Sequence, residues 1–72
     1  MSGLIKRSVT IAGHRTSVSL EPVFWDALVG AAEAEGRSVN ALVAEIDEAR
    51  TTNLSSAIRV WLFERRGPIQ AR

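Results

Sequence analysis

The chain has 72 residues, no cysteine and one histidine, and its formal net charge is +1 at pH 7. This composition excludes a disulfide framework and leaves almost no ligands for a structural zinc ion. Apolar residues make up 46% of the chain, which is more than so short a chain buries alone, so we expect an obligate oligomer. Since no run of 18 apolar residues and no signal-peptide core is present, we expect a cytoplasmic protein that does not span a membrane.

The charges are unevenly distributed along the chain. Residues 1–20 hold three basic residues and no acid, residues 21–50 have a net charge of −5, and residues 51–72 have a net charge of +3. A basic arm ahead of an acidic body is typical of an edge that binds a polyanion. Chance clustering of three charges is the alternative explanation of the same distribution.

Residues 15–20 alternate strictly between polar and apolar side chains. Thr16, Val18 and Leu20 share one side of the predicted strand, and the other side carries Arg15, Ser17 and Ser19. A lone strand has no ladder for its backbone groups, so the simplest partner is the same strand of a second copy. The paired strands would present a polar face narrow enough for the DNA major groove.

Residues 7–11 also alternate, with Val9 and Ile11 on one side, and Ala12-Gly13-His14 has the composition of a tight connection. Residues 7–20 are therefore either a strand or a short hairpin, and the two alternatives stay open. Gly13 is the expected site of a positive φ angle, and His14 is interpreted as a spacer in the turn rather than a metal ligand. No internal repeat is evident.

Three helices are predicted after the strand, over residues 21–35, 38–50 and 54–66. Pro22 begins the first helix and Gly36 caps its end. Apolar residues recur at helical spacing in all three, with Trp25, Val29 and Ala32 widening the face of the first. In the third helix, Val60 and Phe63 lie off the apolar stripe, so we expect some apolar surface to remain exposed for a partner.

The start of the second helix is a candidate anion site. Its free N–H groups and the helix dipole favour a phosphate, and Arg37, Ser38 and Asn40 lie there. Taken alone, these residues are explained by an ordinary helix cap with Ser38 as the N-cap. The anion site becomes credible only beside a ribbon that enters the major groove.

A strand, a helix, then Gly36-Arg-Ser-Val-Asn40 and a second helix resemble the ribbon-helix-helix family of bacterial and phage repressors. The resemblance covers about residues 15–50, and the longer run from Lys6 to the segment after Asn53 resembles a group of short bacterial members. It implies a mainly α fold with a short N-terminal β segment, a ribbon-helix-helix dimer carrying an additional C-terminal helix. The domain would span residues 7–66, between a flexible arm at 1–6 and a tail at 67–72.

The resemblance also implies roles for particular residues. Arg15, Ser17 and Ser19 would contact base edges in the major groove. The phosphate contacts would come from Arg37, Ser38, Val39 and Asn40, with Lys6 and Arg7 of the basic arm. The chain departs from the minimal family pattern in its extra strand-like segment, its third helix and a second helix that has no lysine.

The leading hypothesis is a sequence-specific DNA-binding transcriptional regulator, a bacterial repressor that acts as a homodimer through antiparallel strand pairing. The alternative is a dimeric protein-interaction or antitoxin-like module that binds a protein partner through the third helix. No glycine-rich phosphate loop, nucleophile with a nearby base or carboxylate pair can be assembled, so we expect no enzyme, no catalytic residue, no cofactor and no metal.

Overall fold

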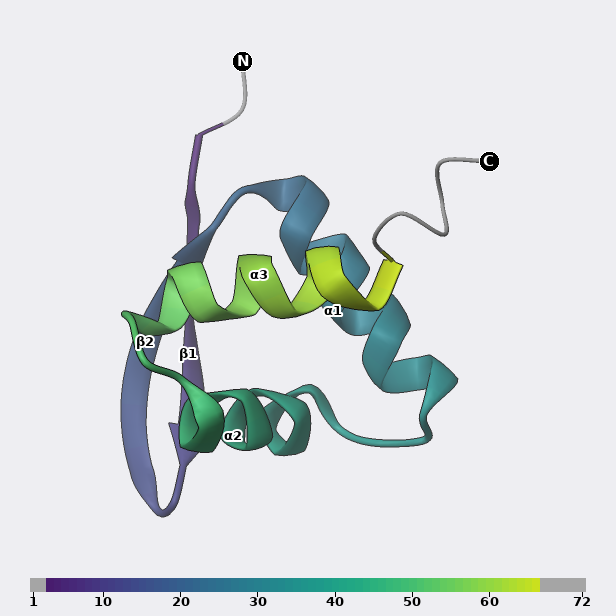
Figure 1. Ribbon diagram of the computed structural model, residues 1–72. Helices are drawn as coiled ribbons and strands as arrows, with labels where there is room; N and C mark the ends of the chain where they lie inside the picture. The colour runs from purple at the N-terminus through teal and green to yellow at the C-terminus, as the bar shows by residue number, and fades with distance from the viewer. Residues whose placement is uncertain (1–2, 67–72) are drawn as a thin grey trace.

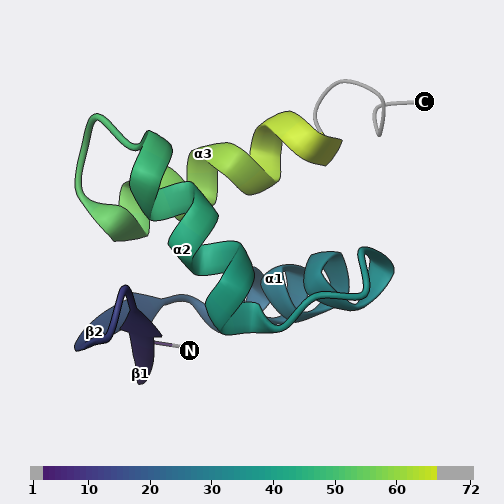
Figure 2. The same cartoon turned by 90° about the horizontal axis from the view of Figure 1, so that it is seen from below.

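The computed structural model describes residues 3–66, in which a two-stranded sheet is followed by three helices (Figure 1). The elements are β1 (Ile5–Ile11), β2 (His14–Leu20), α1 (Pro22–Ala34), α2 (Val39–Ala49) and α3 (Leu54–Arg66). The hairpin lies at one end of the molecule, and the helices pack against one of its faces (Figure 2). The predicted mainly α fold with a short N-terminal β segment and a third helix is confirmed.

The hairpin alternative is the one that the structure adopts. β1 pairs antiparallel with β2 along its whole length, from Ile5 opposite Leu20 to Ile11 opposite His14. The lone-strand argument for a second copy therefore loses its premise, because β2 finds its partner in the same chain. β1 begins at Ile5, so residues 5 and 6 of the predicted flexible arm belong to the sheet. The predicted tail, 67–72, lies outside the described residues.

The turn of the hairpin has a two-residue loop with both φ angles positive, 53° at Ala12 and 81° at Gly13. Two positive φ angles define a type I′ turn, whose twist matches that of the flanking strands. The prediction for Gly13 is confirmed. Alanine at the first position is a departure from the asparagine or aspartate that this turn favours.

The helix ends are stabilised by local hydrogen bonds that the sequence anticipates. At the end of α1, Gly36 has a φ of 66°, and the N–H of Arg37 donates to the carbonyl of Ala32 over 2.9 Å. This is a Schellman cap, for which glycine is preferred. At the start of α2, the Oγ of Ser38 accepts from the N–H of Ala41 over 3.0 Å, so the predicted N-cap is confirmed.

The core draws on all five elements, and its buried side chains are Val9, Val18, Leu20, Trp25, Leu28, Ala32, Leu42, Val43, Ile46, Ile58 and Leu62. Trp25 is buried more deeply than Phe24, because its indole N–H donates to the carbonyl of Ile5 over 2.8 Å and ties α1 to β1. Phe24 instead faces Arg59 of α3, whose guanidinium lies 5.7 Å from the ring centroid. The wide apolar face of α1 thus contacts both β1 and α3.

Candidate nucleic-acid interface

The side of the hairpin turned away from the helices is entirely polar. Val9, Val18 and Leu20 are buried on the helix side, so the alternate residues of each strand point outward. We call this surface the outward ribbon face, and its members are Lys6, Ser8, Thr10, Arg15, Ser17 and Ser19. It carries two cations and no acid, and a two-stranded ribbon is narrow enough to enter a DNA major groove.

The three residues predicted to contact bases all lie on this face. Arg15 and Ser17 are exposed, whereas Ser19 is half-buried beside α3. The hydroxyl of Ser55 in α3 donates to the backbone carbonyl of Ser19 over 3.0 Å, and this bond occupies part of the outer edge of β2. Arg15 and Ser17, nearer the turn, are therefore the more accessible of the three.

The sequence interpretation missed Ser8 and Thr10 as members of the same face. The pairing register places Ser8 opposite Ser17 and Thr10 opposite Arg15, so these side chains extend the polar row across both strands. The signal was present in the alternation of residues 7–11. It becomes informative only when the two-residue turn is recognised, because that turn sets which side of β1 faces outward.

Arg7 does not share the outward ribbon face with Lys6. It lies opposite Val18 on the helix side of the sheet, and its guanidinium lies 5.2 Å from the ring centroid of Trp25. Adjacent residues of a strand point to opposite faces, so the two basic residues of the predicted arm separate. Lys6 extends from the outward ribbon face, and Arg7 lies at the border of the sheet and the helices.

The start of α2 lies against the outer edge of β1. The side-chain oxygen of Asn40 accepts from the backbone N–H of Thr10 over 3.4 Å. A surface groove between the two elements brings Arg7 and Ser8 of β1 beside Ser38 and Asn40. The structure thus assembles one cation, two hydroxyls and the N-terminal end of a helix on the flank of the ribbon, and the amides of a helix's first turn favour an anion.

Arg37 is engaged within the chain. Its guanidinium forms ion pairs with Glu45 and, over 3.4 Å, with Glu35, and it donates to the carbonyl of Ala41 over 3.2 Å. Two carboxylates close to one guanidinium leave little positive field for an external phosphate. Of the residues predicted to contact phosphate, Arg37 is the one whose charge is already compensated, while Val39 is half-buried beneath the groove.

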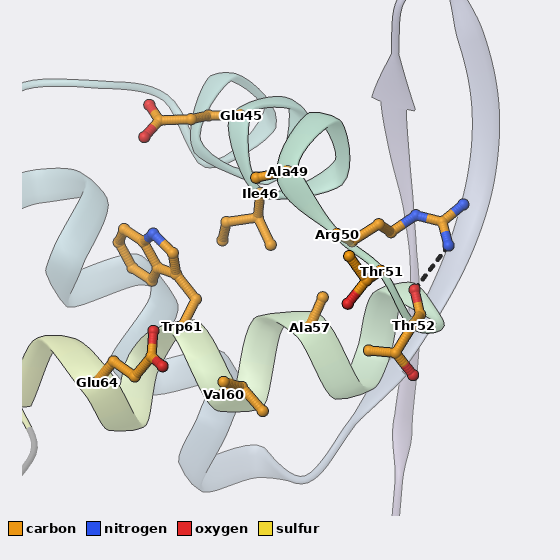
Figure 3. A pocket seen from close by; sticks show the side chains of 10 residues that line it. All are labelled: Glu45, Ile46, Ala49, Arg50, Thr51, Thr52, Ala57, Val60, Trp61 and Glu64. Atoms are coloured by element: carbon orange, nitrogen blue, oxygen red, sulfur yellow. Dashed lines mark hydrogen bonds between the residues drawn. The ribbon is translucent and has the colours of Figure 1, made fainter.

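A second groove lies between α2 and α3 (Figure 3). Ile46 of α2 and Ala57 of α3 face each other across it, and Val60 and Trp61 line it further along α3. At one end Arg50 donates to the carbonyl of Thr52 over 2.7 Å. Within residues 3–66, no cluster of three metal-ligating side chains is found, and no helix is long and apolar enough to cross a membrane.

Among the comparisons with known proteins, the one with protein families agrees with this geometry. None of the curated proteins and none of the solved structures compared with the chain matches it. The family model described as the ribbon-helix-helix domain matches residues 4–65, which includes both strands and nearly all of α3. The extra strand and the third helix therefore lie within the family match rather than outside it. The chain belongs to the ribbon-helix-helix domain family, whose members are typically non-enzymatic modules that generally bind DNA as dimers in transcription regulation.

Proposed function

We propose that this protein is a sequence-specific DNA-binding regulator that represses transcription in the bacterial cytoplasm and acts as a homodimer. The observation that carries the proposal is the outward ribbon face, which is polar along both strands, holds Lys6 and Arg15 and has no acid. This face enters the major groove, and the start of α2 lies on the adjoining phosphates. Binding there excludes other proteins from the same stretch of DNA.

Base recognition is assigned to Arg15, Ser17 and Ser19. A bidentate contact between Arg15 and a guanine discriminates against other bases by about 1–3 kcal/mol. Serine hydroxyls donate to or accept from several bases, so Ser17 and Ser19 add less discrimination. The half-buried position of Ser19 supports a smaller share for it than for Ser17.

Phosphate contacts are assigned to two groups of residues. Ser38, Val39 and Asn40 offer the amides and side chains of the α2 start, and Arg7 lies in the same groove. Lys6, on the outward ribbon face, is assigned to the DNA phosphates on the other side of the major groove. Arg37 must leave Glu35 and Glu45 before it reaches a phosphate, so we assign it the smallest share. These contacts supply most of the affinity and make it salt-dependent.

The homodimer contact is placed on α3. Phe63 is 70% exposed and Val60 is 52% exposed, although both are large apolar side chains. Val60 also lines the groove between α2 and α3, so a second copy gains apolar contact there. Antiparallel pairing of β2 with the same strand of another copy is the other contact available to the homodimer, because β1 occupies one edge of β2 and Ser55 covers only part of the second edge. The alternative function, a module that binds a different protein through α3, is favoured by the same two exposed residues.

The test is a binding isotherm on DNA fragments from the gene's own upstream region, at two salt concentrations. Wild-type protein is compared with Arg15→Ala and with Arg65→Ala, a matched control on α3. We expect salt-sensitive, sequence-dependent binding by the wild-type protein. Arg15→Ala should weaken this binding by about tenfold or more and remove its sequence specificity, and Arg65→Ala should leave it unchanged. Absence of binding at low salt would refute DNA recognition and favour the protein-binding alternative.

A further inference from the structure

The groove between α2 and α3 has an apolar floor and a size that suits a small molecule. Its volume is about 310 Å³, at the lower end of the range of about 300–1,000 Å³ in which small ligands bind. The apolar residues that line it are Ile46, Ala49, Ala57, Val60 and Trp61. Ile46 is buried and Trp61 is half-buried, so an occupant contacts aliphatic and aromatic carbon along both helices (Figure 3).

The charges around this groove favour a cation. Glu45 and Glu64 line it at the end where Trp61 lies, whereas Arg50 lines the opposite end (Figure 3). The charge of Arg50 is already compensated, because its Nε donates to Asp47 over 2.6 Å. α2 itself holds three acids and no base, so its side of the groove is negative. The absence of lysine from this helix, a departure from the minimal family pattern, thus leaves a groove that is apolar within and negative at one end.

Trp61 adds an electron-rich ring to the negative end of the groove. The guanidinium of Arg65 lies 4.5 Å from the ring centroid, which shows that this indole accommodates a cation. The lining of the groove includes Trp61 but not Arg65, so the ring contacts both. An ammonium group beside Glu64 and Trp61 therefore gains a carboxylate and a π system, while its apolar body covers Ile46 and Ala57.

Glu45 connects the groove to the start of α2. The residue lines the groove, and its carboxylate also forms an ion pair with Arg37. The Glu45 side chain is 54% exposed, so it can turn toward a ligand in the groove. Arg37 has a second partner, Glu35, over 3.4 Å, but the other carboxylate oxygen of Glu35 pairs with Arg65. An ammonium group that takes Glu45 therefore leaves Arg37 with one shared carboxylate and a less compensated charge.

We propose that the groove between α2 and α3 binds a small organic cation with an apolar body, of the class of the aromatic amines, and that its occupation frees Arg37 for a DNA phosphate. The second step rests on the proposed function. A ligand shifts an equilibrium only through a difference in its affinity for two states, and here the ligand and Arg37 compete for the carboxylate of Glu45. The amine-bound protein is then the stronger DNA binder. By linkage, DNA strengthens amine binding by the same factor.

Binding is tested without DNA, by NMR titration with phenethylammonium. Matched probes are phenethyl alcohol, which has the ring without the charge, and ethylammonium, which has the charge without the ring. We expect saturable shifts at the indole N–H of Trp61 and the amide of Ala57, in the millimolar range for so small a ligand. The indole N–H of Trp25, which is buried and bonded to Ile5, should not move. No saturation with phenethylammonium, or equal affinity for phenethyl alcohol, would overturn the site.

Variants separate this site from general electrostatics and from a rival occupant. Glu64→Gln should weaken phenethylammonium binding by about threefold or more. Glu48→Gln makes the same charge change at an exposed position of α2 outside the groove and should leave binding unchanged. Ala49→Phe fills the groove from an exposed position and should abolish binding. If Phe63 of a second copy filled the groove, Phe63→Ser would instead strengthen amine binding, and this outcome would overturn the proposal.

DNA affinity tests the coupling to Arg37. Glu45→Gln removes the partner that the ligand takes, so we expect it to tighten DNA binding by about threefold or more without any amine, whereas Glu48→Gln should not. Phenethylammonium should tighten wild-type DNA binding relative to ethylammonium at the same concentration. In an Arg37→Gln background both gains should vanish.

The possible failures can be told apart. Amine binding in the groove with no effect on DNA affinity would overturn the coupling, as would a gain that persists in Arg37→Gln. Absence of DNA binding under every condition would overturn the proposed function. The NMR titration contains no DNA, so it would still decide whether the groove binds the amine.

Discussion

The side-chain oxygen of Asn40 accepts a hydrogen bond from the backbone N–H of Thr10, over 3.4 Å, and so joins the start of α2 to the edge of the ribbon. The two elements are 30 residues apart in the sequence. Because the N–H of Thr10 points outward from the edge of β1, this bond also gives a partner to a backbone donor that β2 does not reach. One side chain thus links the start of α2, for which we propose phosphate contacts, to the strands for which we propose base contacts.

Replacing Asn40 with alanine should therefore affect DNA binding more than folding. We expect the free energy of unfolding to fall by about 1 kcal/mol or less, since the bond is long and exposed. DNA affinity should fall severalfold, because the helix start loses its position beside the ribbon. The control is Asn53→Ala, which removes the bond from the Ser56 N–H to Asn53 at the start of α3. An Asn40→Ala variant with wild-type affinity would contradict this coupling.

The turn of the hairpin offers a stabilising substitution. Ala12 has a φ of 53°, and a left-handed conformation costs an L-residue about 1–2 kcal/mol. Asparagine tolerates this region and is preferred at the first position of a type I′ turn. Ala12→Asn should raise the free energy of unfolding by about 0.5–1 kcal/mol in a urea titration. Ala34→Asn, at an exposed helical position, should not, and equal effects at both sites would argue against this turn.

Val18 tests which face of β2 is buried. Its side chain is 2% exposed in the core, so Val18→Asp places a carboxylate in an apolar environment and should cost about 3 kcal/mol or more. Circular dichroism should show an unfolded chain. The neighbouring Ser17→Asp is on the outward ribbon face and should fold, yet bind DNA poorly through charge repulsion. A folded Val18→Asp variant would mean that the strand is inverted.

The proposed association through α3 would make stability depend on protein concentration. The wild-type melting temperature should rise as concentration increases, because dimerisation favours the folded state by mass action. Phe63→Ser should remove this dependence while leaving the fold intact, since Phe63 is 70% exposed. Val23→Ser, which removes a similarly exposed apolar side chain from α1, serves as the control. A melting temperature of wild-type protein that is independent of concentration would rule out the dimer.

The carboxyl group of Glu21 makes the stability of the fold depend on pH. A hydrogen bond from its own backbone and a second from the Nε of Arg59, over 3.0 Å, lower the pKa of this carboxyl below its ordinary value of 4.5. A lowered folded-state pKa stabilises the fold above the unfolded-state pKa, and the contribution is lost as pH falls through the folded-state value. Glu21→Gln should therefore lower the melting temperature at neutral pH and reduce its decline in acid. Glu33→Gln, at an exposed position, is the control, and identical acid profiles of wild type and Glu21→Gln would contradict the role of this pair.

Much of the architecture was predictable because local patterns express it directly. Alternation from Thr16 to Leu20, the proline at the start of α1 and the glycine at 36 each follow from backbone and burial preferences within a few residues. The same locality explains why the cap at Ser38 was identified correctly. Local spacing does not, however, show that Trp25 is buried more deeply than Phe24, since it does not show which of two adjacent aromatic residues has a hydrogen-bond acceptor within reach.

The sequence by itself determined the order of the elements, the polar side of β2 and the family to which the chain belongs. Only the tertiary structure decided that β1 pairs with β2, that Arg7 stacks on Trp25 while Lys6 faces outward, and that Arg37 is held by Glu35 and Glu45. These facts depend on pairing register and on contacts between distant segments, where a shift of one residue reverses every side chain.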